Sequence, residues 1–146
     1  MADPSPQQIA ELVRDAMLAG DHATKMLGMR VVEVGPGRAV IEMAVRQDML
    51  NGHAICHGGL IATLADSTFA FACNAYNELS VASGFSIDLL APGRLGDLLT
   101  ATCRELSKSG RTGVYDTDVL NQRGERIAVF RGRSYTARGK PVVALG

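Results

Sequence analysis

The chain has 146 residues, the size of one domain, and 47% of them are hydrophobic, which excludes a disordered protein. Its 15 Lys and Arg balance its 15 Asp and Glu, so a protein that binds nucleic acid or a membrane surface is not expected. The balance is uneven along the chain, because residues 1–93 carry five basic and ten acidic side chains and residues 94–146 carry ten and five. Most of the basic residues in the second part are expected in solvated strands and turns, with a few available to an anionic ligand.

Three cysteines, Cys56, Cys73 and Cys103, are odd in number and widely spaced, so a disulfide framework is not expected. This usage is typical of a reducing compartment. The first residues are polar and acidic, without the apolar segment of a secretory signal, and no apolar run has the length of a membrane span. We therefore expect a soluble cytoplasmic protein.

The N-terminal segment predicts a helix that starts after Ser5. Ser5 is a favoured N-cap residue, Pro6 suits the first helical position, and Gln8 can return the cap hydrogen bond. Apolar residues then recur at helical spacing as far as Met17, and Gly20 ends the pattern. A short amphipathic helix is therefore expected before the first strand.

Six runs of residues are typical of β-strands, and turn residues separate them. Two precede and four follow the one long apolar segment of helical period, from Gly58 to Ala75. Because only one such helix exists, an antiparallel sheet wrapped around it is the economical α+β architecture. Residues 1–146 then form one domain, with tails at 1–4 and 139–146. The strands are expected over residues 29–34, 38–46, 81–90, 97–107, 113–121 and 126–137.

Asp66 is the only charged residue between Asp48 and Glu78, and it lies in the middle of this central helix. A helix that carries apolar or small residues on both faces is expected to be buried on both faces. Burial of an unpaired carboxylate costs free energy or shifts its pKa. The carboxylate therefore indicates a function, although hydrogen bonds from Thr63 or Ser67 would be a purely structural alternative. One face of the predicted helix holds Leu60, Ile61, Leu64, Thr68 and Phe71, and the other holds Ala62, Thr63, Asp66, Phe69, Ala70 and Cys73.

His57, Gly58 and Gly59 stand at the start of the same helix. Glycines at this position leave backbone N–H groups unshielded at the positive end of the helix dipole, which suits an anion or a developing oxyanion. The simpler interpretation is a tight turn from loop to helix, which also favours glycine. By itself the glycine pair does not separate these two interpretations.

A single sheet covers only one side of a helix, so the second apolar face predicts a homodimer. Gly58 and Asp66 are about 12 Å apart along the helix axis. A carboxylate that attacks a carbonyl carbon, or activates water beside it, must come within roughly 3–3.5 Å. One chain cannot meet this requirement alone. Antiparallel pairing of two such helices across a two-fold axis would bring Asp66 of one chain to Gly58 of the other, twice per dimer.

The segment LNGHAICHGGLIATLADSTFAFACN strongly resembles the corresponding segment of hotdog-fold acyl-CoA thioesterases of the phenylacetate-degradation type. The resemblance extends over most of the chain and includes IDLLAPGRLGDLLTA, SGRTGVYD and VFRGRSY. It implies the hotdog fold and hydrolysis of an acyl-CoA thioester, with phenylacetyl-like thioesters as the leading substrate. It also implies a homodimer that assembles as a dimer of dimers. No cofactor is implied, because coenzyme A is part of the substrate.

The same resemblance implies roles for individual residues. Asp66 would be the catalytic carboxylate, as nucleophile or as general base toward water, and the Gly58 N–H would polarise the thioester carbonyl. Asn51 and His57 would support the thioester and the attacking group, and Ser83 aligns with a position that holds the hydrolytic water. Contacts with the substrate or its CoA moiety are implied at Gly59, Arg111, Thr112 and Gly113.

Three other functions compete with thioester hydrolysis. A metal site at His53, Cys56 and His57 lacks a convincing fourth ligand. A hotdog hydratase or dehydratase would need an acid/base pair, for which His57 and Asp66 are available, although the glycine pair fits hydrolysis better. A non-catalytic acyl-CoA-binding protein would need no carboxylate at this position, so Asp66 favours an enzyme. The acyl group itself is left open.

Overall fold

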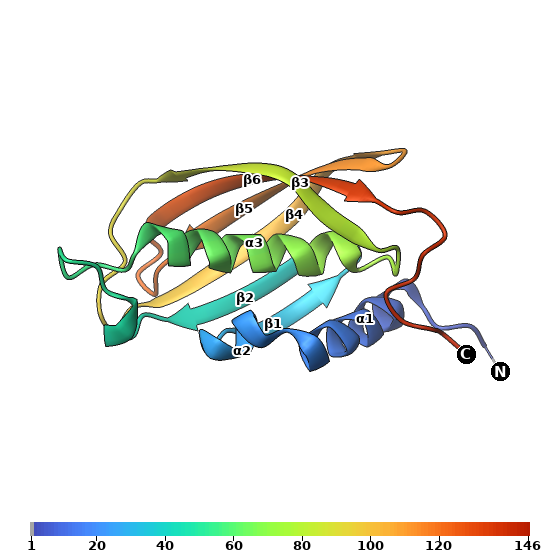
Figure 1. Ribbon diagram of the computed structural model, residues 1–146, viewed down its shortest axis with the longest axis horizontal. Helices are drawn as coiled ribbons and strands as arrows, with labels where there is room; N and C mark the ends of the chain where they lie inside the picture. The colour runs from blue at the N-terminus through green and yellow to red at the C-terminus, as the bar shows by residue number, and fades with distance from the viewer. Residues whose placement is uncertain (1) are drawn as a thin grey trace.

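The computed structural model describes residues 2–146, in which six antiparallel strands form one sheet that curves around the helix α3 (Figure 1). The strand order is β1-β2-β4-β5-β6-β3, so β1 and β3 are the edges. This arrangement confirms the predicted antiparallel sheet around one long central helix. The elements are α1 (Pro6–Gly20), α2 (His22–Met26), β1 (Arg30–Gly35), β2 (Arg38–Ala44), the 3-10 helix η1 (Gln47–Met49), α3 (Gly58–Asn74), β3 (Ser80–Leu89), β4 (Leu98–Ser109), β5 (Thr112–Leu120) and β6 (Arg126–Thr136).

The helix α1 begins with the capping box that the sequence predicts. The Gln8 N–H donates to Ser5 Oγ at 3.1 Å, and the Ser5 N–H donates to Gln8 Oε1 at 2.8 Å. Gln7 Nε2 donates to the carbonyl of Val34 at 2.7 Å, which ties α1 to the end of β1. The five-residue helix α2, which Asp21 caps, was not predicted. The second half of α1 lies beside α3, where Met17 lines a pocket together with residues of α3.

The face of the sheet that points toward α3 carries the core. Ile61, Leu64, Thr68 and Phe71 are buried as predicted, and Leu60 is half-buried. The prediction that Phe69 and Cys73 face away from this core was wrong, because both are buried within the protomer. The Phe69 ring lies 5.5 Å from that of Tyr115 and 5.9 Å from that of Phe130.

Curvature of the sheet explains this difference. The curved sheet contacts a larger part of the helix circumference than a flat sheet would, so residues on the flank of α3 also meet strands. Gly132 permits the close approach, since a Cβ there would lie 2.8 Å from atoms of the Phe69 ring. The side of α3 that remains uncovered is therefore narrow. It is lined by the half-buried residues Ala62, Thr63, Asp66 and Ala70.

The edge strand β3 borders the uncovered side of α3 and leaves large apolar side chains in solvent. Val81, Phe85 and Leu89 are 58%, 44% and 52% exposed. An edge of unpaired backbone groups combined with exposed apolar side chains is typical of a surface that another chain covers. The protomer therefore presents β3 and the outer side of α3 as one continuous candidate interface.

The residues that follow β6 contain no helix or strand, but they are anchored at the C-terminal end of α3. The Leu79 N–H donates to the carbonyl of Lys140 at 2.8 Å. Asn77, with a φ of 63°, accepts the N–H groups of Val142 and Val143 at 3.0 Å each and donates to the Val143 carbonyl at 2.9 Å. The segment runs past the end of α3 toward α1 (Figure 1).

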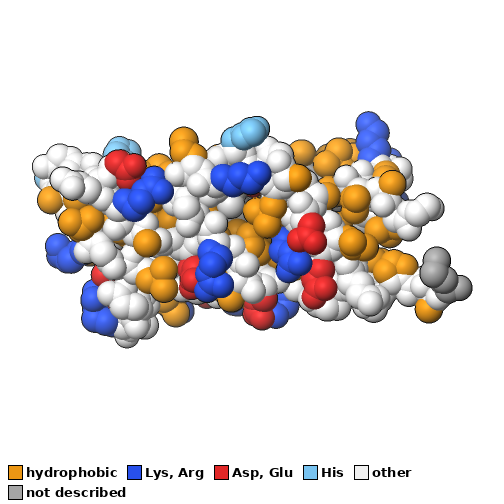
Figure 2. Space-filling model, turned by 90° about the horizontal axis from the view of Figure 1, so that it is seen from below, with side chains coloured by type: hydrophobic (Ala, Val, Ile, Leu, Met, Phe, Trp, Pro, Cys, Tyr) orange, Lys and Arg blue, Asp and Glu red, His pale blue; other side chains and the backbone are white. Residues whose placement is uncertain are grey.

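Charged side chains of both signs are interspersed on the face shown in Figure 2, where no large region carries a single sign. Across the described residues, many charged side chains form local ion pairs, such as Arg38 with Glu33 at 2.5 Å and Arg46 with Asp48 at 3.0 Å. Pairs this exposed contribute little to stability. Across residues 2–146, the helices are all too short or too polar to span a membrane.

Candidate active site

Asp66 lines a pocket of about 350 Å³ between α3 and β3. Burial raises the pKa of the Asp66 carboxyl above its usual value. The structural alternative was a hydrogen bond from Thr63 or Ser67. The Thr63 hydroxyl instead donates to the carbonyl of Gly59 at 2.9 Å, and within residues 2–146 neither hydroxyl bonds to the Asp66 carboxylate. Among the residues that line this largely apolar pocket, none is a cation that could compensate the Asp66 carboxylate, which fits a reactive group better than a structural one.

The start of α3 has one uncommitted donor. His57 caps the helix: its Nδ1 accepts the Gly59 N–H at 3.3 Å, and its carbonyl accepts the Leu60 N–H at 2.9 Å. The N–H of Gly58 donates to no atom within residues 2–146. A free N–H at the positive end of a 17-residue helix is the type of donor that stabilises an oxyanion. The structure therefore gives His57 a structural role and leaves Gly58 available.

A second pocket, of about 410 Å³, contains Gly58 and Asn51 together. The Asn51 Oδ1 accepts the His53 N–H at 2.9 Å, so its carbonyl oxygen is engaged within the loop. The absence of a side chain at Gly58 has a local reason, because a Cβ there would lie 2.5 Å from Leu89 Cδ1. Both pockets lie between α3 and β3, one at the start of the helix and one beside its middle.

The structure does not bring the other predicted contact residues to these pockets within one protomer. Ser83 lies at a bulge in β3, where its Oγ donates to the carbonyl of Arg133 at 3.1 Å. Arg111 and Thr112 lie at the turn between β4 and β5 and line neither pocket. Packing accounts for Gly113, since a Cβ there would lie 2.7 Å from Ser134 Oγ.

Thiol and metal chemistry find little support in these pockets. Cys73 lines the same pocket as Asp66, but burial raises the pKa of its thiol to about 12. A thiol with so high a pKa is a poor nucleophile near neutral pH. Within residues 2–146, no group of three or more His, Cys, Asp or Glu side chains is placed to hold a metal ion.

Several residues that line the pockets were not among the predicted site residues. Leu89 contributes to the pocket at Gly58, and Met17 and Val142 contribute to the pocket at Asp66. These are apolar residues of ordinary type from separate parts of the chain. Alternating apolar residues in β3 are the only sequence signal that could have indicated Leu89, and no such signal exists for Val142.

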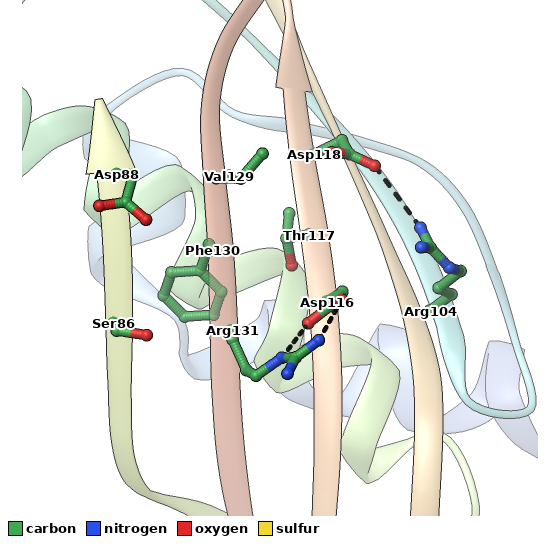
Figure 3. Close-up of a pocket in the computed structure, with 9 residues that line it drawn as sticks. All are labelled: Ser86, Asp88, Arg104, Asp116, Thr117, Asp118, Val129, Phe130 and Arg131. Carbon is green, nitrogen blue, oxygen red and sulfur yellow. Dashed lines mark hydrogen bonds and ion pairs between the residues drawn. The ribbon is translucent and has the colours of Figure 1, made fainter. Parts of the chain in front are cut away.

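Another hollow, of about 320 Å³, lies on the face of the sheet that points away from α3 (Figure 3). Two of its three carboxylates are paired: Arg131 contacts Asp116 through two nitrogens, at 2.7 and 2.9 Å, and Arg104 contacts Asp118 at 3.5 Å. The third, Asp88, is exposed to solvent. The Arg131 guanidinium holds the pKa of Asp116 below its usual value. Two of these acids are committed to ion pairs and the third stands in solvent, whereas Asp66 lies in a largely apolar pocket, so the chemistry is expected on the α3 side.

Known proteins resemble this chain over most of its length. The family model described as the thioesterase superfamily matches residues 53–128, a segment that contains both Gly58 and Asp66. Acyl-coenzyme A thioesterase PaaI of Escherichia coli (strain K12) is 44% identical over 124 residues, which are 85% of this chain and 89% of that protein.

Solved structures give the same relationship. The structure of the E. coli PaaI protein from the phenylacetic acid degradation operon matches with a TM-score of 0.91 at 42% identity, over 93% of this chain and 99% of that one. The protein smu.793 from Streptococcus mutans UA159, solved with acetyl CoA bound, matches with a TM-score of 0.72 at 27% identity, over 75% of this chain and 88% of that one.

These matches confirm the resemblance that the segment around Gly58 and Asp66 carries. They also confirm the hotdog fold, in which an antiparallel sheet wraps one long helix. The family model covers more than half of the chain, and the E. coli enzyme exceeds 40% identity over most of both proteins. The chain therefore belongs to the thioesterase superfamily, as an enzyme with the hotdog fold.

Proposed function

We propose that this protein is an acyl-CoA thioesterase that hydrolyses an aryl-acetyl or related acyl-CoA thioester to the free acid and CoA. One observation carries the proposal: a single helix holds an uncommitted N–H at Gly58 and a lone carboxylate at Asp66, both in pockets between α3 and β3. The name of the E. coli relative, and the acetyl CoA bound to the S. mutans protein, support a CoA thioester as substrate. The operon of the E. coli protein supports an aryl-acetyl group.

The proposal requires two chains. Gly58 and Asp66 of one chain are about 12 Å apart along α3, too far to act on one carbonyl. Antiparallel pairing of two α3 helices would bring Asp66 to Gly58 of the partner subunit. Ala62 lies midway between them and would face its own copy, and its small side chain permits close approach. The apolar edge of β3 supports the same pairing, and two such dimers would assemble as a tetramer.

The chemistry then follows from the paired helices. The thioester carbonyl oxygen accepts the Gly58 N–H of the partner subunit, which stabilises negative charge as it develops on that oxygen. Asp66 in its ionised form either attacks the carbonyl carbon or removes a proton from an attacking water. If Asp66 activates water, the carbon–sulfur bond breaks after the water oxygen adds, and the proton taken by Asp66 passes to the CoA sulfur. If Asp66 itself attacks, the CoA thiolate departs and an anhydride forms between the acyl group and Asp66. A water molecule then hydrolyses this anhydride, which restores the carboxylate and supplies the proton for the CoA sulfur. In both cases the acid leaves as a carboxylate and one water is consumed. The reaction uses no cofactor or metal.

Three further residues have supporting roles in this proposal. The Asn51 NH₂ group is available to the thioester because its carbonyl oxygen is engaged in the loop, and His57 fixes the helix start. Ser83 is assigned to the hydrolytic water, and its position on β3, at the candidate interface, supports this.

CoA is expected to extend toward Arg111, Thr112 and Gly113, with further contact at Gly59. The β4–β5 turn lies toward the same end of the molecule as the C-terminal end of α3 (Figure 1). The start of the partner's α3 would point to this end in an antiparallel dimer. The three cysteines, all unpaired and buried, support a reducing compartment such as the cytoplasm.

A hydrolysis assay tests the function directly. The purified protein would be incubated with phenylacetyl-CoA, acetyl-CoA and an enoyl-CoA, and the released CoA would be measured with a thiol reagent. We expect release from phenylacetyl-CoA that depends on Asp66. Binding of the thioesters without release would indicate a non-catalytic binding protein, and hydration of the enoyl-CoA without release would indicate a hydratase.

A further inference from the structure

The pocket at Asp66 extends along α3 and has a closed end. Its helical wall is formed by Asp66, Ala70, Cys73 and Asn74, which lie on one stripe of α3 about 12 Å long. The opposite wall is the start of β3, over residues 79–82. Asp66 is the one ionisable carboxylate in this lining, and it stands at the end of the stripe nearest the start of the helix. An acyl group attached at Asp66 would therefore lie along this stripe.

Hydrogen bonds close the other end of the stripe. Asn74 Nδ2 donates to the carbonyl of Ser80 at 3.0 Å, and the Ser80 N–H donates to Asn74 Oδ1 at 2.9 Å. Both groups are buried, so this pair joins α3 to β3 firmly. A ligand in the pocket cannot pass between the helix and the strand beyond this point.

Two apolar side chains from distant parts of the chain complete the wall. Met17 comes from α1 and is partly buried against the core. Val142 comes from the segment after β6 and is held through its backbone, because Asn77 binds the N–H groups of Val142 and Val143. Asn77 itself has a φ of 63°, a conformation that asparagine tolerates better than most residues. The position of Val142 therefore depends on Asn77.

We propose that Met17 and Val142 form the end wall of the acyl pocket and limit the length of the acyl group, with Asn77 as the positioning residue for Val142. This inference rests on the proposed function. The pocket volume of about 350 Å³ is near the lower end of the usual range for ligand sites, which fits a compact acyl group. The accepted substrates are then aryl-acetyl and short alkanoyl thioesters, and long-chain acyl-CoA is excluded.

The first test varies the wall and the substrate together. Values of kcat/KM would be measured for butyryl-, hexanoyl-, octanoyl- and decanoyl-CoA and for phenylacetyl- and 4-phenylbutyryl-CoA. The wild-type values identify the shortest straight-chain thioester that the protein does not accept. For this thioester, the double variant Met17→Ala, Val142→Ala is expected to raise kcat/KM, relative to the value for butyryl-CoA, by about tenfold or more. Val142→Phe is expected to shift the limit toward shorter acyl groups. Val143→Ala is the matched control, since it removes the same methyl groups from a neighbour that does not line the pocket.

The second test separates positioning from folding. Asn77→Gly keeps the left-handed backbone but removes the three hydrogen bonds that hold Val142 and Val143. It is expected to extend the accepted length as Val142→Ala does, mainly through a lower KM for the longer thioesters. Asn77→Asp keeps the acceptor for both N–H groups and should retain the wild-type length limit.

The outcomes distinguish this inference from the function on which it rests. If the wild-type protein releases CoA from none of the thioesters, the proposed function and the inference both fail. If it hydrolyses them but the length profile is unchanged in the Met17, Val142 and Asn77→Gly variants, only the inference fails. Because Met17 and Val142 are partly exposed, folding of these variants is expected, and circular dichroism would verify it.

Discussion

Asp66 is half-buried in the uncovered side of α3, and burial raises its pKa, so the folded protein retains the carboxyl proton to a higher pH than the unfolded chain does. The free energy of unfolding is therefore lower at neutral pH than it would be with a neutral side chain at this position. A group kept at such a cost is typical of a functional site. Its removal should affect activity and stability in opposite directions.

Asp66→Asn tests this opposition. The variant keeps the shape of the side chain but loses the charge that, in the proposed mechanism, attacks the carbonyl carbon or activates water. We expect kcat to fall by about 10²- to 10⁴-fold, while the free energy of unfolding stays equal or increases. Released CoA and chemical denaturation would be measured on the same preparation. Turnover near the wild-type level would remove Asp66 from the mechanism.

The raised pKa of Asp66 also predicts a pH dependence with a definite sign. Below the usual pKa of 3.8 the carboxyl is protonated in both the folded and the unfolded chain, and above its raised value it is ionised in both. Between these limits only the folded protein holds the proton. Stability relative to Asp66→Asn should therefore fall as the pH rises through this window and then level off.

Activity should follow the opposite course, because the proposed mechanism uses the ionised form of Asp66. We expect kcat/KM to rise with pH, with a midpoint above 3.8. Denaturation curves and kcat/KM measured in parallel from pH 3.5 to 8 would check both trends. A difference in stability from Asp66→Asn that grows as the pH is lowered would contradict the assignment.

At the level of elements, α3 shows what the sequence could predict. Its extent was predicted to within one residue, because a long apolar segment with a glycine start has an unambiguous helical period. The inward orientation of Phe69 was not predicted, because a helical wheel contains no information about how far a sheet curves around it. The five-residue α2 was missed because a single turn and a half has almost no periodic signal.

The uncovered side of α3 leads to a prediction about pairing. Ala62→Glu would place two carboxylates against each other at the two-fold axis of the proposed dimer. We expect dimerisation to weaken by at least about a hundredfold, with loss of activity but not of fold, because Ala62 faces away from the sheet. Sedimentation at several concentrations would measure this.

A matched substitution shows whether the position matters. Ala19→Glu introduces the same charge at an exposed residue of α1, away from the candidate interface, and should leave the assembly unchanged. The pairing of the α3 helices would be disproved if Ala62→Glu remained a dimer with full activity.

On the scale of the whole molecule, the central question is whether each active site is shared between chains. Asp66→Ala lacks the carboxylate and Gly58→Pro lacks the N–H donor, so each variant should be inactive. The backbone of His57, with φ of −59° and ψ of 129°, is compatible with a following proline. Both variants should be made in a Leu89→Ala background, because the proline ring would otherwise meet Leu89.

Mixing the two inactive proteins provides the measurement. Each mixed dimer would contain one site with both lesions and one intact site. With random exchange of chains, activity should return to about a quarter of that of Leu89→Ala alone. If mixed dimers are shown to form but remain inactive, Asp66 and Gly58 do not act together at one site across the interface.

The candidate site was predictable only in part from the sequence. Asp66 and Gly58 could be proposed from the sequence because a lone charge and a glycine pair stand out in an apolar helix, and both line pockets in the structure. Met17, Leu89 and Val142 were not, because they are common apolar residues that only the folded chain brings to the pockets. The partner-facing arrangement stays a prediction, since it concerns contacts between two chains.

The three buried cysteines have a practical consequence for chemical reactivity. Burial raises the pKa of Cys56, and it raises the pKa of Cys73 and of Cys103 to about 12, so thiolate is scarce in the native state. A disulfide reagent should then modify these thiols only as fast as the structure opens, and all three at once in denaturant. In an assay of the native protein, such a reagent would therefore detect released CoA with little background from the protein's own thiols. Prompt modification of any cysteine without denaturant would show that part of the core opens freely.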